Sequence, residues 1–307
     1  MIRHKFYIGM MAVALLLPSC SQEEDAALPQ GADEVGQALT ISTRATTDDS
    51  FDSFRLCLSD AATGTKKEEH ILTKGANGAW LENGELPVTA LLPAIVNASV
   101  CDNPDQITFE NLVKNGELQV YWITSVIPTD QTDAGKLASA CKLMYAFYPQ
   151  LEKNGKLSLT FQHACSKLVF NVNKEKIEAA EGVGNLNSIK INANNESIYI
   201  YQYNNENRGW ISGTPNDNGF DCFYNETDKT ITAYIGYNKY KAGDVLMTLS
   251  VDGISRNVPI NADLTVEPGN VYTFTLDITP KEVTANVVAN EGNNDIPGWD
   301  ESNEEEL

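Results

Sequence analysis

Residues 245–260 read VLMTLSVDGISRNVPI, two runs of alternating apolar and polar residues that meet at Asp252-Gly253. Asp-Gly between two such runs is a strong signal of a β-hairpin, because a type I′ turn needs positive φ at both central residues. The apolar positions that share one face of the first run are Val245, Met247, Leu249 and Val251. In this register Arg256 would lie beside Leu249 on the core side, so we expect either a position near a rim or a slip in the register.

The same alternation continues toward the C-terminus. Glu267-Pro268-Gly269-Asn270 is a type II turn sequence, with proline and glycine at its two central positions. It leads into a run in which the apolar residues again occupy every second position, namely Tyr272, Phe274, Leu276 and Ile278. We therefore expect a second buried face on this strand.

The first half of the chain has the same character. Phe54, Leu56 and Leu58 alternate with polar residues, and residues 118–123 (LQVYWI) form another expected strand. One short helix is expected over residues 134–143, with Asp133 as its N-cap. Short strands separated by turns, without a long helix, predict an all-β fold of antiparallel sandwiches.

A change of phase divides the chain. The apolar residues fall on odd positions in residues 157–163 and mainly on even positions in residues 168–172. One straight strand cannot keep both sets on the same face, so we expect a bulge or bend near residues 163–167, where a strand leaves one sheet for another. We expect an N-terminal β-sandwich domain over residues 45–156, a C-terminal one over residues 157–300 and an acidic tail at 301–307.

The N-terminus predicts export and lipidation. A basic start and a short apolar stretch end in Leu17-Pro18-Ser19-Cys20, which resembles the lipobox of a lipoprotein signal peptide over residues 1–19. Cys20 would then carry the acyl chains, and residues 20–44 would form a leader containing one strand near residues 38–42. The alternative is an ordinary secretory signal with an incidental cysteine. Residues 21–25 (SQEED) resemble the surface-export signal of Bacteroides-type lipoproteins, and a solvated spacer is the alternative.

Charge and cysteine content exclude several classes of function. Removing residues 1–19 takes away Arg3 and Lys5 and no acid, which leaves 20 basic and 42 acidic residues. Such a field repels nucleic acid, so no nucleic-acid partner is expected. Five cysteines remain after Cys20, and no two have C-x-x-C spacing, so we expect small buried apolar residues, with one disulfide as an alternative. No metal or cofactor is expected.

Several short motifs resemble the fimbrillin-like proteins, the pilins of Bacteroides and its relatives. Residues 144–146 (MYA) and residues 157–172, with Phe-x-His-x-x-Ser-Lys-Leu from Phe161, resemble the start of their C-terminal domain. Residues 269–276 (GNVYTFTL) resemble their penultimate strand, and residues 296–299 (IPGW) resemble their closing Ile-x-x-Trp. Residues 43–46 (TRAT), following a lipoprotein signal, match their leader.

This resemblance implies two tandem transthyretin-like Greek-key β-sandwich domains and a subunit of a surface fimbria. It implies an anchor in the outer membrane through Cys20 and an Arg-specific surface protease that cuts between Arg44 and Ala45. Departure of the leader strand would expose an edge that a strand from another subunit fills. The donor would be residues 283–288 (VTANVV), since the acidic tail cannot enter an apolar groove. Without a donor the subunit would be a tip or accessory pilin and not a stalk pilin.

Catalysis is not expected. The chain has no G-x-S-x-G, H-E-x-x-H or P-loop sequence. His163 is expected to be a packed structural residue, and His70 lies in a charged stretch that we expect to be exposed.

The rival function is a surface lipoprotein that binds a host glycan or protein and does not polymerise. Its candidate contacts are aromatic residues that could stack on sugar rings, namely Tyr199, Tyr201, Tyr203 and Trp210. Tyrosine is also common in strands for packing reasons alone, which is the competing explanation.

Overall fold

The computed structural model describes residues 36–45, 51–114, 117–151, 154–173, 186–193, 197–203, 207–212, 219–251, 253–278 and 283–292. The expected signal peptide, Cys20 and the acidic tail lie outside these residues. The described residues form an all-β protein, with one α-helix, α1 (Ala134–Cys141), and one 3-10 turn, η1 (Pro104–Gln106). No helix in this part of the chain is long and apolar enough to span a membrane.

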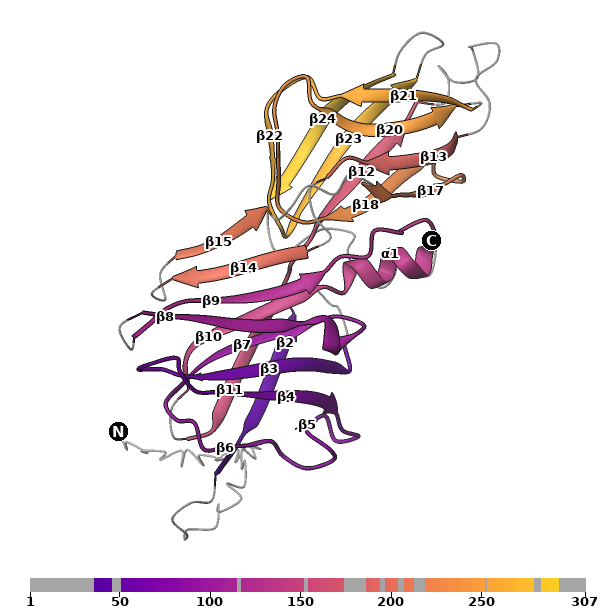
Figure 1. The fold of residues 1–307 in the computed structure, drawn as a ribbon. Coiled ribbons are helices and arrows are strands. Elements are labelled where there is room, and N and C mark those ends of the chain that lie inside the picture. Colours follow the sequence, from indigo (N-terminus) through magenta and orange to yellow (C-terminus); the bar gives the residue numbers. More distant parts are fainter. Residues whose placement is uncertain are drawn as a thin grey trace, which may run out of the picture. The chain divides into compact units, whose positions relative to one another are not determined.

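A seven-stranded sheet organises the N-terminal part (Figure 1). Its strands, in spatial order, are β2 (Thr40–Ala45), β11 (Lys156–His163), β10 (Met144–Leu151), β7 (Ala94–Val100), β3 (Ser53–Asp60), β4 (Lys67–Lys74) and β5 (Trp80–Leu81). A small sheet of β1 (Gln37–Ala38) and β6 (Val88–Thr89) lies next to β2 in the sequence. Phe54, Leu56 and Leu58 are all fully buried in the core of this sheet, as their alternation predicted.

A second, four-stranded sheet combines segments that are distant in sequence. Its order is β15 (Asn207–Ser212), β14 (Ser197–Tyr203), β9 (Glu117–Val126) and β8 (Thr108–Lys114). The hairpin β14–β15 lies well beyond residue 157 in the sequence, yet it pairs with β9, which precedes α1. This sheet therefore draws strands from both sides of the expected domain boundary.

The C-terminal part contains two larger sheets and one small one. The five-stranded sheet has the order β17 (Phe223–Asn225), β18 (Thr230–Ile235), β12 (Ser166–Val172), β23 (Asn270–Ile278) and β24 (Val283–Gly292). The four-stranded sheet has the order β16 (Phe220–Asp221), β13 (Leu186–Ile191), β20 (Val245–Val251) and β21 (Ile254–Pro259). The small sheet pairs β19 (Asn238–Tyr240) with β22 (Leu264–Val266).

The hairpin at residues 245–260 forms as β20 and β21, and Gly253 has φ +78°. Arg256 pairs with Leu249 in the predicted register and is partly buried. The register shifts at the other end of the hairpin, between Val245 and Met247. This irregularity buries Leu246 completely and leaves Val245 half-buried, so the strict alternation predicted for Val245 is wrong there.

The phase change near residue 164 marks a change of sheet. β11 ends at His163 in the seven-stranded sheet, and β12 begins at Ser166 in the five-stranded sheet. The bend is confined to Ala164-Cys165, both of which are buried. β11 shares its sheet with β2 and β10, although the boundary expected at residue 157 would assign it to the second domain.

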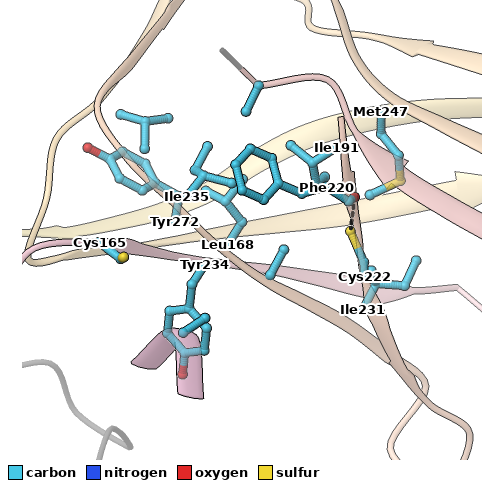
Figure 2. Packing of buried hydrophobic residues seen from close by; sticks show 14 of the residues in the cluster. Cys165, Leu168, Ile191, Phe220, Cys222, Ile231, Tyr234, Ile235, Met247 and Tyr272 are labelled. Atoms are coloured by element: carbon cyan, nitrogen blue, oxygen red, sulfur yellow. Dashed lines mark hydrogen bonds between the residues drawn. The ribbon is translucent and has the colours of Figure 1, made fainter. Parts of the chain in front are cut away.

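Buried thiols, among them Cys165 and Cys222, pack in the larger apolar cluster of the molecule (Figure 2). The described cysteines, Cys57, Cys101, Cys141, Cys165 and Cys222, are all buried thiols. Burial raises the pKa of Cys222 to about 12, and burial together with the nearby Glu69 carboxylate raises the pKa of Cys57 to about 11. These thiols therefore stay protonated at neutral pH and pack as small apolar groups.

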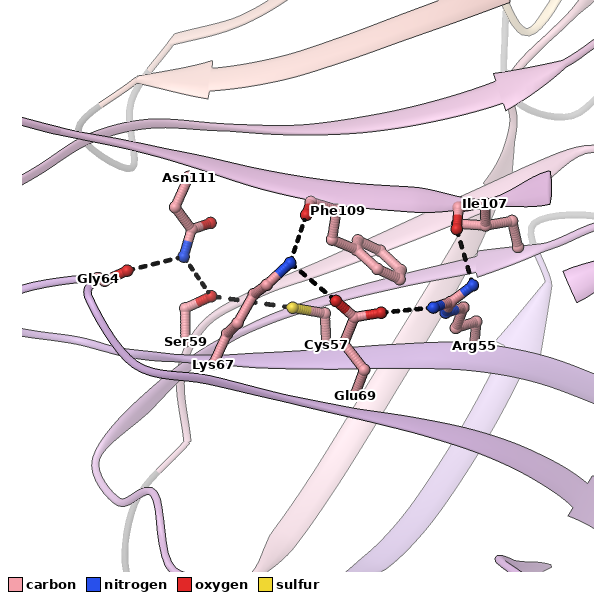
Figure 3. Close-up of polar contacts among 9 residues, drawn as sticks. All are labelled: Arg55, Cys57, Ser59, Gly64, Lys67, Glu69, Ile107, Phe109 and Asn111. Atoms are coloured by element: carbon pink, nitrogen blue, oxygen red, sulfur yellow. Dashed lines mark hydrogen bonds and ion pairs between the residues drawn. The ribbon is translucent and has the colours of Figure 1, made fainter. Parts of the chain in front are cut away.

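Polar side chains join the seven-stranded sheet to β8 (Figure 3). Arg55 Nη1 donates a hydrogen bond to the carbonyl of Ile107 at 2.8 Å, and Lys67 Nζ donates to the carbonyl of Phe109 at 2.9 Å. Both cations also pair with the carboxylate of Glu69, at 2.7 Å and 2.9 Å. We call Arg55, Lys67 and Glu69 the inter-sheet ion network.

Candidate functional site at the leader strand

The leader strand, β2, is an edge strand of the seven-stranded sheet (Figure 1). It runs parallel to β11, with Thr40 opposite Lys156 and Ala45 opposite Phe161. Parallel neighbours are joined by a long connection, and here the connection holds most of the N-terminal strands. Within this sheet β2 pairs with one neighbour, β11.

Alternate residues of the leader face the core. Leu39 is fully buried and Ile41 is 8% exposed, and both belong to the apolar cluster inside the seven-stranded sheet. Thr43 and Ala45 continue this face and are half-buried, whereas Thr40, Ser42 and Arg44 are exposed.

In the pairing of β2 with β11, the inward positions Ile41, Thr43 and Ala45 lie opposite Leu157, Leu159 and Phe161. We call the surface that these residues cover the leader groove.

The start of the leader is held by close backbone contacts. Leu39 N donates to the carbonyl of Pro87 at 2.8 Å, and Thr40 N donates to the carbonyl of Gly155 at 2.8 Å. Gly155 has φ +63°, and a Cβ there would lie 2.4 Å from the carbonyl oxygen of Ala38. Glycine is therefore required at residue 155 for the leader to approach β11 this closely.

The leader also meets the opposite edge of the sheet. Trp80 in β5 donates a hydrogen bond from Nε1 to the hydroxyl of Thr43 at 3.1 Å. The indole is 4% exposed and lies against Phe51 and Phe54, with ring centroids 5.6 Å and 4.8 Å away. Because β2 and β5 are the first and last strands of the sheet, this contact closes the seam of a strongly curled sheet.

Arg44 lies within the strand. The expected strand ended near Ser42, but β2 continues through Ala45, and Arg44 Nε donates to the hydroxyl of Thr160 at 2.9 Å. Arg44 is exposed, as a cleavage site requires. The bond between Arg44 and Ala45 lies at the C-terminal end of this edge strand.

The aromatic residues proposed for ligand contact lie on the hairpin of the four-stranded sheet. Tyr199, Tyr201 and Tyr203 are in β14, and Trp210 is in β15. The register pairs Trp210 with Ile200 and Gly209 with Tyr201. Trp210 therefore occupies a register position of the opposite phase to the three tyrosines.

The expected donor segment is a strand of the C-terminal part. Residues 283–288 lie in β24, which pairs with β23 over its whole length. Val283 and Ala285 are buried in the C-terminal core. A donor role would require β24 to leave this sheet.

The two described histidines differ in how well the sequence predicted them. His163 is buried, and its Nδ1 lies 3.2 Å from the carbonyl of Cys141, in agreement with a packed structural residue. The exposure expected for His70 is wrong: it is buried, and its Nδ1 lies 2.8 Å from the Glu82 carboxylate. β4 alternates, so His70 shares the inward face with Leu72 within a charged stretch.

Among the described residues no group of three or more His, Cys, Asp or Glu could hold a metal ion.

The partnership of Thr43 and Trp80 was not apparent from the sequence. Thr43 belongs to a polar run, and 36 residues separate it from Trp80. The inward phase of Leu39 and Ile41, continued by two residues, would have placed Thr43 on the buried face. Its partner depends on the curl of the sheet, which no local pattern predicts.

Two solved structures illustrate the similarity to known proteins. A candidate cell adhesion protein from Bacteroides uniformis has 15% identity and a TM-score of 0.49, covering 84% of this chain and 98% of its own. The tip fimbrial protein Mfa3 from Porphyromonas gingivalis has 14% identity and a TM-score of 0.43, covering 83% and 98%. Both TM-scores are below 0.5, so neither similarity supports a conclusion about function. No curated protein sequence matches the chain.

The decisive match is to a protein family. A sequence model described as fimbrillin-like matches residues 80–299, which is more than half of the chain. The matched range begins at Trp80, in the strand that closes the seam, and includes β11, which the leader covers. The chain belongs to the fimbrillin-like family.

Proposed function

We propose that this chain is a structural subunit of a cell-surface fimbria that supports adhesion, and that it assembles by exchange of its leader strand. In this proposal an Arg-specific surface protease cuts after Arg44, β2 leaves the leader groove, and a strand from a neighbouring subunit replaces it. The observation that carries the proposal is the position of β2, an edge strand of the seven-stranded sheet whose inward face lies on an apolar core.

The physical argument concerns what the departing strand leaves behind. Complete burial of a leucine or isoleucine side chain stabilises a fold by about 1.5–3 kcal/mol, so loss of Leu39 and Ile41 is costly. The backbone of β11 would also lose its pairing on one side, along the positions from Lys156 to Phe161. An added strand with apolar residues at alternate positions restores both contributions.

The anchoring and export expected from the N-terminus complete the proposal. Acylated Cys20 would hold the precursor on the outer-membrane surface, where several acyl chains give stable attachment. Cleavage after Arg44 would separate the subunit from this anchor as it frees the groove. The place of the subunit as stalk, accessory or tip pilin depends on whether β24 or another segment serves as its donor.

Surface material from wild-type cells and from an Arg44→Lys variant tests the proposal. Lysine keeps the charge but is not cut by an Arg-specific protease, so the variant should retain the leader and lose the high-molecular-weight ladder on an unboiled gel. Edman sequencing of the wild-type subunit should begin at Ala45.

A matched control is Ser42→Ala, a change on the same exposed face of β2 that leaves Arg44 intact. It should polymerise like the wild type. An equal ladder from Arg44→Lys, or an acylated Cys20 on every mature wild-type copy, would contradict the proposal.

A further inference from the structure

The leader groove contains one buried polar group among apolar ones. Trp80 Nε1–H is a donor with no acceptor capacity, and its partner is the hydroxyl of Thr43, on the leader itself. When the leader departs, this donor loses its partner. An incoming strand buries the indole again and must supply an acceptor at the same place or leave a buried donor unsatisfied.

We propose that the leader groove selects its incoming strand by sequence, an inference that rests on the proposed function. Trp80 requires serine or threonine at the third inward position, which Thr43 fills in this structure. The first and second inward positions, filled here by Leu39 and Ile41, take large aliphatic residues. The fourth, opposite Phe161, is filled by Ala45, which stays with the cut chain as its new N-terminal residue. The preferred partner is therefore an extended segment with aliphatic, aliphatic and Ser/Thr residues at alternate positions.

The pattern disfavours a second copy of this chain as the donor through β24. The buried phase of β24 begins with Val283 and Ala285 and continues in register with Val287, which pairs with Phe274; the register shifts before Ala289, which pairs with Thr273. Valine then lies where the indole N–H of Trp80 needs a hydrogen-bond acceptor. A different kind of subunit is therefore the better source of the incoming strand, and this chain occupies a position that receives a strand from such a subunit.

Peptide exchange tests the selection directly. The full chain is cut once after Arg44 with limited Arg-specific protease, single cleavage is checked by mass spectrometry, and labelled peptides are bound by fluorescence anisotropy. The reference peptide is residues 36–44 (GQALTISTR), and the variants carry Thr43→Ser or Thr43→Val. We expect Ser to bind like Thr, and Val to bind about tenfold more weakly, which corresponds to about 1.4 kcal/mol.

Valine is the more apolar residue and has nearly the shape of threonine. A groove that responds only to buried apolar area would bind the Thr43→Val peptide at least as tightly as the reference, and this result would overturn the inference. A peptide of residues 283–289 (VTANVVA) should also bind more weakly than the reference, and equal binding would count against the inference.

A double-mutant cycle assigns the effect to the indole. In a Trp80→Phe chain the donor is gone, so the Thr and Val peptides should bind equally. If that chain does not fold, the three peptides on the wild-type chain still decide the question. Failure of the reference peptide to bind the cut wild-type chain would overturn the proposed function itself, and this inference with it.

Discussion

At the residue scale, Gln131 joins two parts of the chain that the sequence separates by about a hundred residues. Its amide Nε2 donates to the carbonyls of Pro128 and Tyr234, at 2.9 Å and 2.8 Å. Its Oε1 accepts from the backbone N–H of Tyr234 at 2.8 Å. The side chain is fully buried, so these three hydrogen bonds lie away from solvent.

We expect Gln131→Leu to lower the free energy of unfolding by about 2–4 kcal/mol. Leucine has a similar volume but can make none of these three buried hydrogen bonds, each of which contributes about 0.5–1.5 kcal/mol. Urea unfolding followed by circular dichroism measures the change. The neighbouring Thr132 is exposed, so Thr132→Ala should leave the midpoint nearly unchanged; equal effects of the two substitutions would contradict this account.

At the element scale, the inter-sheet ion network joins β8 and the residue before it to β3 and β4. Burial of the Glu69 carboxylate raises its pKa, but hydrogen bonds from Lys67 and Arg55 outweigh burial and hold the pKa below its usual 4.5. A carboxylate with a depressed pKa in the folded state stabilises the fold above the unfolded pKa. This contribution is lost as the pH falls below about 4.5.

We expect Glu69→Gln to lower the free energy of unfolding by about 1 kcal/mol at pH 7, since the carboxylate is partly screened by solvent. The difference from the wild type should shrink as the pH falls from 5 to 3, because wild-type Glu69 then becomes neutral. Chemical unfolding over this pH range measures it. Glu110→Gln, an exposed change on β8, should show neither effect, and a difference for Glu69→Gln that persists at pH 3 would contradict the electrostatic explanation.

At the scale of the whole molecule, one apolar cluster unites residues from both sides of the expected boundary. It includes Cys57 and Phe109 from the N-terminal sheets, Leu137 from α1, and Phe170 and Phe274 from the C-terminal sheet. The hairpin β14–β15 adds a backbone connection to β9. The described residues accordingly belong to one compact unit.

We expect Leu137→Ala to destabilise this whole unit by about 3 kcal/mol, because it removes a fully packed leucine from the shared cluster. Tryptophan fluorescence and far-ultraviolet circular dichroism should report the same shifted transition. Lys136→Ala, at the next position on the exposed face of α1, should leave the transition in place. A separate C-terminal transition that Leu137→Ala does not shift would show that the two parts unfold independently.

The strands that local patterns predicted do form, although the structure has many more. The type II turn at Gly269 forms with φ +78°, and the face of β23 that begins with Tyr272 is buried as its alternation required. The N-cap of α1 is also as predicted, with the Asp133 side chain accepting from Lys136 N. These features depend on residues within about one turn or one strand, so the sequence near them carries the information.

Long-range pairing was not predictable in the same way. No local signal indicates that β2 runs parallel to β11, that β14 joins β9, or that Trp80 meets Thr43 across the seam. These contacts depend on sheet curl and on chain closure over tens to more than a hundred residues. The sequence by itself determined the all-β class, the buried strand faces and the resemblance to pilins, because side-chain period and turn chemistry are local. Only the tertiary structure decided which sheet edge the leader covers and which hydrogen-bond donor, the indole N–H of Trp80, lies in the leader groove.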